Sequence, residues 1–136
     1  MKLNNIQFDL NSFATEMAKQ NNDQHFDFLV TIVGEDFGEE GLGCIYILEN
    51  TLTHERMSVK AVNANRDEAY IPSVSHLWKA AEILEREVYD FFGIIFTSNP
   101  DMRRIFLRSD FVGYPMRKDY DMDPEKNKYH LFDDPE

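Results

Sequence analysis

Residues 85–118 read EREVYDFFGIIFTSNPDMRRIFLRSDFVGYPMRK, a run in which charged and aromatic side chains alternate with little else between them. The run holds six cations and five anions and so carries +1, whereas residues 1–84 carry −7 and residues 119–136 carry −5. Arginine and aromatic residues are enriched together at buried protein–protein surfaces, and arginine also forms bidentate pairs with carboxylates. The composition predicts either a surface that binds another protein or a well-paired structural core with a solvated exterior.

The beginning of this run is predicted to complete an amphipathic helix. One apolar stripe recurs at helical spacing and comprises Leu77, Ala81, Leu84, Val88 and Phe91 or Phe92. Ser73 or Ser75 is the expected N-cap, and Gly93 is the expected C-terminal stop. Glu82, Arg86 and Asp90 fall at i, i+4 and i+8, which predicts a ladder of ion pairs along the helix.

Glu87 is the charged residue that this helix is expected to bury in part, because it shares a stripe with Ala80, Ile83 and Phe91. A part-buried carboxylate needs a cation or backbone N–H groups. The candidate partners are Arg103, Arg104 and Arg117. Pairing with one of them predicts that Glu87→Gln destabilises the domain.

Beyond the helix, the run is predicted to form short elements joined by turns. Residues 94–96 and 104–107 are expected to be strands. Residues 97–101 form a predicted turn around Pro100, and residues 110–115 form one around Gly113.

The run also resembles the signature of a known family. In chain order its elements are Glu85, Arg86, Glu87, Asp90, Gly93, Pro100, Arg103, Arg104, Asp110, Gly113, Pro115, Arg117, Lys118, Asp119 and Tyr120. This set is similar to the motif of the 30-kDa subunit of respiratory complex I, which is the C-type subunit of NADH:quinone oxidoreductase. Related subunits of membrane-bound nickel–iron hydrogenases and formate hydrogenlyase share it. Three positions depart from the pattern: Asn99 stands where the family usually has His, Phe111 where it has Trp, and Met116 where it has Leu.

The resemblance implies a structural subunit in the hydrophilic arm of a complex I-like enzyme, on the cytoplasmic side of the membrane. Such a subunit has no flavin, iron–sulfur cluster or quinone site of its own. It lies beside the 49-kDa-type and cluster-N2-type subunits. The assembly uses NADH, flavin, iron–sulfur clusters and quinone. The alternative that the resemblance leaves open is the equivalent subunit of a membrane-bound hydrogenase or formate hydrogenlyase.

A stand-alone small hydrolase or metal enzyme is the hypothesis of a different class, with Glu87 and Asp90 as its carboxylates. Glu85 and Glu87 point in nearly opposite directions on a helix, which argues against a carboxylate cluster. The four histidines are scattered, no nucleophile or dinucleotide motif is present, and the single Cys44 cannot hold an iron–sulfur cluster alone. We therefore predict no catalytic, metal-binding or cofactor-binding residue in this chain.

The first half of the chain is predicted to be a helix followed by a sheet. Leu10, Phe13, Ala14, Met17 and Ala18 form an apolar helical stripe behind candidate caps at Asp9, Asn11 and Ser12. Residues 26–33 alternate as a strand with Phe26, Phe28, Val30 and Ile32 on its apolar face. Residues 34–43 are expected to be an acidic loop. Residues 44–48 and 57–63 are two further strands of an antiparallel meander.

The whole chain is predicted to be an α+β protein with a single two-layer domain. Two main helices pack on a mixed, mostly antiparallel sheet in residues 1–115, and residues 116–136 form an extended tail that docks on a partner. The net charge of −11 argues against nucleic acid and against anionic lipid as partners. No signal peptide is visible, and no apolar stretch approaches the ~20 residues that span a bilayer.

Overall fold

The computed structural model describes residues 4–120 of the chain. Its elements in chain order are β1 (Asn4–Gln7), α1 (Phe13–Asn22), β2 (Phe28–Asp36), the short 3-10 helix η1 (Gly38–Glu40), β3 (Leu42–Glu49), β4 (Arg56–Asn63), β5 (Tyr70–Pro72), α2 (Ala81–Phe92) and β6 (Ile95–Thr97). Residues 98–120 follow without a regular element. The later part of the predicted tail, residues 121–136, lies outside the described residues. None of the helices within residues 4–120 is long and apolar enough to cross a membrane.

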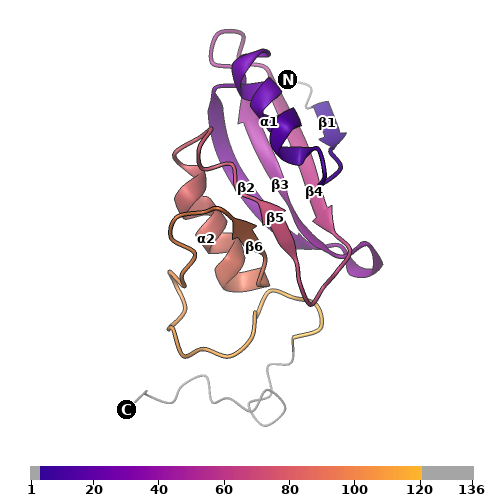
Figure 1. Ribbon diagram of the computed structural model, residues 1–136, viewed down its shortest axis with the longest axis vertical. Helices are drawn as coiled ribbons and strands as arrows, with labels where there is room; N and C mark the ends of the chain where they lie inside the picture. The colour runs from indigo at the N-terminus through magenta and orange to yellow at the C-terminus, as the bar shows by residue number, and fades with distance from the viewer. Residues whose placement is uncertain (1–3, 121–136) are drawn as a thin grey trace.

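The main sheet has four strands in the order β1-β4-β3-β2 (Figure 1). The pairs β2–β3 and β3–β4 are antiparallel, and β1 pairs in parallel with β4. A second, two-stranded sheet joins β5 and β6 in parallel. The predicted meander and mixed sheet are thus confirmed, while β1 and β5 are strands that the sequence pattern does not indicate.

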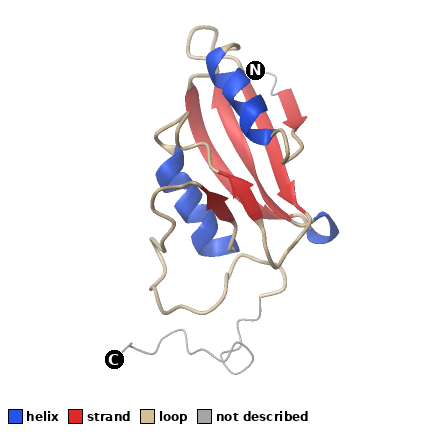
Figure 2. Cartoon of the chain, viewed as in Figure 1, coloured by secondary structure: helices blue, strands red, loops and turns tan. Residues whose placement is uncertain are grey.

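Both helices lie on the same side of the main sheet, which makes two layers (Figures 1 and 2). Phe13 of α1 packs on Tyr46 of β3, with ring centroids 5.3 Å apart. Gly34 of β2 faces α2 so closely that a Cβ there would lie 2.5 Å from the Phe92 ring. Leu42, Cys44, Tyr46 and Leu48 alternate along the inner face of β3 and are buried between the layers. The predicted α+β, two-layer domain is confirmed.

Strand β2 buries different residues from those that simple alternation predicts. Leu29 and Ile32 are buried, whereas Phe28 and Val33 are half-exposed. The pairing with β3 shifts register between Leu29 and Thr31, as in a β-bulge. One extra residue exchanges the two faces of a strand. The predicted inner face at Phe28 and Val30 is therefore wrong.

Two other boundaries differ from the predictions. Strand β2 continues to Asp36 and β3 begins at Leu42, so the predicted loop of residues 34–43 is shorter than expected. Helix α2 begins after Ala80, so neither Ser73 nor Ser75 caps it. The Ser73 hydroxyl instead donates to the Glu85 carboxylate at 2.6 Å. The Ser73 hydroxyl is therefore bound to a buried carboxylate and does not cap the helix, although its spacing from the helix predicts a cap.

The strand predicted at residues 104–107 is wrong. This segment lies across the end of α2 without a neighbouring strand. Its N–H groups point to a side chain, because Ile105, Phe106 and Leu107 all donate to the Asp90 carboxylate. A carboxylate that satisfies three consecutive donors removes the need for a strand partner.

Candidate functional site

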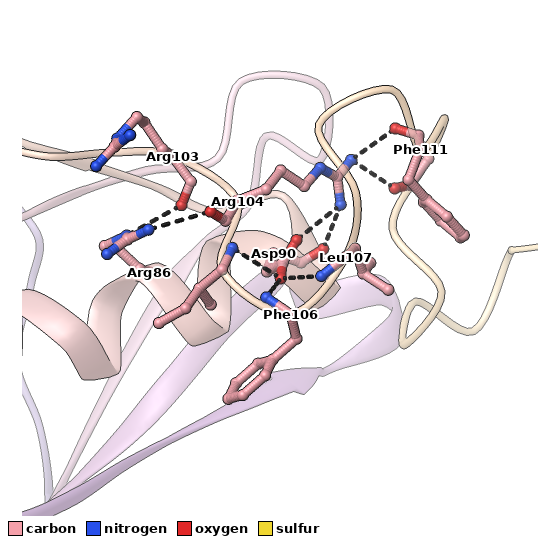
Figure 3. A network of polar contacts seen from close by, with 9 residues as sticks. Arg86, Asp90, Arg103, Arg104, Phe106, Leu107 and Phe111 are labelled. Carbon is pink, nitrogen blue, oxygen red and sulfur yellow. Dashed lines mark hydrogen bonds and ion pairs between the residues drawn. The ribbon is translucent and has the colours of Figure 1, made fainter. Parts of the chain in front are cut away.

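The motif residues gather where the last turns of α2 meet residues 101–117. Asp90 lies at the centre of this contact, and its side chain is fully buried. Its Oδ2 accepts the N–H groups of Ile105, Phe106 and Leu107 at 3.2, 2.7 and 2.9 Å (Figure 3). Burial raises the pKa of Asp90, but the Leu107 and Phe106 N–H groups and Arg104 outweigh it, so the pKa lies below its ordinary value. The carboxylate is ionised and saturated with donors from its own chain.

Arg104 occupies the other side of the Asp90 carboxylate. Its Nη1 donates to Asp90 Oδ1 at 3.1 Å and to the Asp90 carbonyl at 2.7 Å. Its Nη2 donates to the carbonyls of Phe111 and Gly113 at 3.2 and 2.9 Å (Figure 3). The guanidinium also lies 4.9 Å from the Tyr114 ring centroid. One arginine thus joins α2 to the turn around Gly113 through charge-assisted hydrogen bonds and a cation–π contact.

Arg86 makes the equivalent connection one turn earlier on α2. Its Nε and Nη2 donate to the carbonyls of Arg103 and Arg104 at 3.2 and 3.1 Å, and its Nη1 lies 3.6 Å from Asp101 Oδ2. Asp101 also pairs with Arg103. Within residues 4–120, Arg86 pairs with neither Glu82 nor Asp90. The predicted ladder of ion pairs along the helix is therefore wrong, because Asp90 is buried against residues 104–107 and Arg86 is directed to the Arg103 and Arg104 carbonyls and to Asp101.

Glu85 is the second fully buried carboxylate of the motif. It accepts hydrogen bonds from the Ser73 hydroxyl, the Val74 N–H and the Asn99 amide at 2.6, 2.8 and 2.8 Å. Burial raises the pKa of Glu85, and these hydrogen bonds offset the effect only in part. Asn99, one of the departures from the family pattern, thus connects the β6 turn to α2.

Glu87 does not have the role that its helical position predicts. The predicted partial burial of Glu87 is confirmed, but its side chain makes no hydrogen bond or ion pair with any described residue. Arg103 pairs with Asp101 and Arg104 with Asp90, while Arg117 donates to the Phe92 carbonyl at 2.6 Å. The predicted pairing of Glu87 is wrong because the segments that cover α2 meet it at Glu85, through Ser73, Val74 and Asn99, and at Asp90, through residues 104–107.

The glycines and prolines of the motif shape the backbone around these contacts. Gly93 ends α2 with φ of 75°, and a Cβ there would lie 2.6 Å from the Tyr114 ring. Gly113 has φ of 94° at the turn whose carbonyl Arg104 binds. Pro100 lies in the exposed turn after β6, and Pro115 is half-buried between Tyr114 and Met116. The predicted helix stop at Gly93 is confirmed.

The end of the motif lies against the hairpin formed by β2 and β3. The Lys118 N–H donates to Asp36 Oδ2 at 2.9 Å, and Asp36 forms a bidentate pair with Arg66 at 2.7 Å for both bonds. Arg66 also lies 3.4 Å from Asp119. The Arg66 guanidinium holds the pKa of Asp36 well below its usual range. The sequence alone does not indicate that Asp36 and Arg66 belong to this site. Asp36 lies 30 residues from Arg66 and 82 residues from Lys118 in the chain, so no local pattern joins them.

Two further motif residues, Asp110 and Tyr120, lie in the same segment, and the Tyr120 hydroxyl is buried. Tyr120 stacks on Phe111 with ring centroids 6.3 Å apart, and Arg108 lies 3.5 Å from Asp110. No group of three or more side chains within residues 4–120 is placed to hold a metal ion. The chemistry of the described network is therefore the internal pairing of carboxylates with guanidinium and amide donors.

Comparison with known proteins identifies relatives of this chain. Residues 7–126 match the family described as respiratory-chain NADH dehydrogenase, 30 Kd subunit. The chain is 52% identical over 116 residues to the C/D protein of NADH-quinone oxidoreductase from Phocaeicola vulgatus, covering 85% of this chain and 22% of that protein. It is 38% identical over 101 residues to the C-type subunit of NADH-quinone oxidoreductase from Moorella thermoacetica, covering 74% of this chain and 68% of that protein. The chain thus spans less than a quarter of the C/D relative.

Two solved structures share the fold. A trypsin-resistant fragment of Nqo5 aligns with a TM-score of 0.66 and 32% identity, covering 74% of this chain and 85% of that one. A chain of the membrane-bound sulfane sulfur reductase, an archaeal respiratory membrane complex, aligns with a TM-score of 0.76 and 26% identity, covering 99% of this chain and 84% of that one. The chain belongs to the family of the 30-kDa subunit of respiratory-chain NADH dehydrogenase.

Proposed function

We propose that the chain is a structural subunit of the hydrophilic arm of a complex I-like NADH:quinone oxidoreductase. It supports electron transfer by packing against the subunits of the quinone module, at the cytoplasmic side of the membrane. The family match supports the assembly, and the Asp90 network supports the structural role. The buried ionisable groups of the motif, Glu85, Asp90 and Arg104, are all engaged by the chain's own donors and acceptors. Their role is to hold residues 101–117 in one conformation against α2.

The proposed neighbours are a D-type subunit, which is the 49-kDa-type partner of the sequence resemblance, and a cluster-N2-type subunit. The name C/D of the Phocaeicola relative assigns two subunits to one polypeptide, and this chain matches only the smaller part of it. Two subunits that are fused in a relative are expected to be in contact when they are separate chains. NADH, flavin, iron–sulfur clusters and quinone then belong to the assembly, and this chain binds none of them.

The second candidate is the equivalent subunit of another membrane-bound respiratory complex, such as a hydrogenase or formate hydrogenlyase. The similarity to a chain of the sulfane sulfur reductase complex favours this candidate, because it covers 99% of the chain. The identities with curated NADH-quinone oxidoreductase subunits are higher, which favours the first candidate.

Affinity purification of the tagged full chain from native membranes tests both candidates. The first predicts co-purification with D-type and cluster-N2-type subunits in equal amounts, together with NADH:quinone activity in the eluate. Hydrogenase or sulfane reductase activity without NADH oxidation would establish the second. Recovery of the chain alone would contradict both. A flavin or iron–sulfur absorption band in the isolated chain would contradict the structural role.

A further inference from the structure

Glu85 is a fully buried carboxyl group that has no cation as a partner. Its side chain makes no ion pair within residues 4–120. Its hydrogen-bond donors are all neutral, and they are the Ser73 hydroxyl, the Val74 N–H and the Asn99 amide. A negative charge that is buried without a counter-charge is destabilised by desolvation, and protonation removes this cost. The surroundings of Glu85 therefore favour a bound proton.

The Ser73 hydroxyl lies between two oxygens but has a single proton. Its Oγ is 2.6 Å from Glu85 Oε1 and 2.9 Å from Ser75 Oγ, and it also accepts the Ser75 N–H at 3.1 Å. A hydroxyl has one O–H donor and two acceptor lone pairs, so Ser73 donates to one of the two oxygens and accepts from the other. It donates to Glu85 when the carboxylate is ionised. It donates to Ser75 when Glu85 carries the proton and is itself the donor.

The protonated form of Glu85 keeps every hydrogen bond of the ionised form. Its O–H donates to Ser73, while Oε1 still accepts the Asn99 amide and Oε2 still accepts the Val74 N–H. The carboxylate of Asp90 is different, because both of its oxygens face N–H donors from backbone and guanidinium groups. A proton on that carboxylate would oppose a donor. Of these two buried carboxyl groups, only Glu85 is surrounded by groups that accommodate both protonation states.

The other titratable side chains near Glu85 leave its charge uncompensated. Burial raises the pKa of the Cys44 thiol of β3 to about 12 and raises the pKa of Tyr46 well above its ordinary value, so both groups are neutral. The turn after β6 contributes only the neutral Asn99 amide. His76, in the segment between β5 and α2, is exposed and favours the ionised form less than any of the three hydrogen bonds does. Burial outweighs all of these effects and raises the pKa of Glu85.

We infer that Glu85, Ser73 and Ser75 form a proton-binding site, in which the buried carboxyl group receives a proton from solvent through the two hydroxyls. Ser73 is buried and Ser75 is half-buried, so the pair of hydroxyls leads from the carboxyl group toward the surface. During uptake, Ser75 gains a proton from water and passes its own to Ser73, which passes its own to Glu85 Oε1. Each hydroxyl ends with one proton, and no electron is transferred. The site is complete within this chain and does not depend on a partner subunit.

Infrared spectroscopy of the purified full chain tests this site, because a protonated carboxyl group and a carboxylate have separate C–O stretching bands. The band of protonated Glu85 is identified by its loss in Glu85→Gln. It is expected to titrate with a midpoint above about 4.3, the ordinary pKa of glutamic acid. The Val74 amide gives a second measurement without any substitution, since it donates to Oε2 at 2.8 Å. Its NMR chemical shift is expected to change with the same midpoint.

The route through the hydroxyls is tested by the rate of protonation after a light-triggered drop in pH. Ser75→Ala is expected to slow the appearance of the Glu85 band at least about tenfold, although Ser75 makes no hydrogen bond to the carboxyl group. Ser109→Ala, at an exposed serine outside the site, is the matched control and is expected to behave as wild type does. Equal rates in wild type and Ser75→Ala would overturn the route. A carboxyl group that stays ionised down to its ordinary pKa would overturn the site.

Discussion

Asp90 and Arg104 form an ion pair in which the carboxylate is fully buried and the guanidinium nearly so, with Nη1 and Oδ1 3.1 Å apart. Each partner also binds backbone from a different segment. Asp90 accepts N–H groups from residues 105–107, and Arg104 donates to carbonyls of Phe111 and Gly113. The pair therefore determines the path of the chain after β6, and the stability of the domain depends on it.

Asp90→Asn is expected to lower the free energy of unfolding by about 3 kcal/mol, because it leaves Arg104 nearly buried without its counter-charge. Urea unfolding near neutral pH measures the change. Glu87→Gln, three residues away on the same helix, is the matched control and should change stability by less than about 0.5 kcal/mol. A larger effect at Glu87 than at Asp90 would contradict the assignment of the buried carboxylates.

Glu85 is expected to make stability depend on pH in the opposite sense to Asp90. Burial raises the pKa of Glu85 above its unfolded value, so the folded chain binds this proton more tightly. Its stabilising contribution is complete below the unfolded pKa and is lost as pH rises through the folded pKa. The stability of Glu85→Gln relative to wild type should therefore improve as pH rises from the unfolded pKa through the raised folded pKa. Parallel pH profiles of the two proteins would show that this pKa is not raised.

Gly93→Ala is expected to lower stability by roughly 3 kcal/mol, from strain at positive φ together with a clash. A Cβ at Gly93 would lie 2.6 Å from the Tyr114 ring and 2.7 Å from Arg117 Nη2. Gly38→Ala separates the two costs, because Gly38 has φ of 67° and no atom within 4 Å of the added Cβ. That variant should lose only about 1 kcal/mol in thermal or urea unfolding. Equal losses in the two variants would mean that the contact with Tyr114 and Arg117 adds nothing.

Asp36→Ala is expected to release residues 117–120 from the β2–β3 hairpin without unfolding the domain. It removes the acceptor of the Lys118 N–H and the bidentate partner of Arg66. Amide hydrogen exchange at Lys118 should accelerate at least about tenfold, while exchange within β3 stays the same. Glu35→Ala, at the neighbouring position, is the control. Because the pKa of Asp36 is lowered, wild type should show the same release as pH falls through that folded-state pKa.

Regular elements with strong periodicity can be predicted from the sequence. Helix α2 and strands β3 and β4 are indicated by apolar residues at spacings of 3.6 and 2. Strands β1 and β5 are four and three residues long and pair in parallel with distant segments, so their own residues show no period. The bulge in β2 leaves no signal in its own residues because it depends on the pairing with β3.

The candidate site can be predicted as a set of residues but not as a set of pairs. A helical wheel indicates which side chains share a face, and it places Glu87 among apolar neighbours. It does not show that a loop of irregular backbone covers the opposite face and buries Asp90. Three partners of Asp90 are backbone N–H groups, which every residue except proline has. The residue types in the sequence therefore do not indicate these partners.

The three N–H groups at Asp90 have a consequence for how this family can diversify. Ile105, Phe106 and Leu107 contribute only main chain to the carboxylate, so these three hydrogen bonds do not depend on which side chains the residues carry. Any residue other than proline can occupy these three positions without losing the acceptor at Asp90. The exposed side chain at residue 106 could therefore be exchanged, in evolution or by engineering, while the hydrogen bonds to Asp90 are kept.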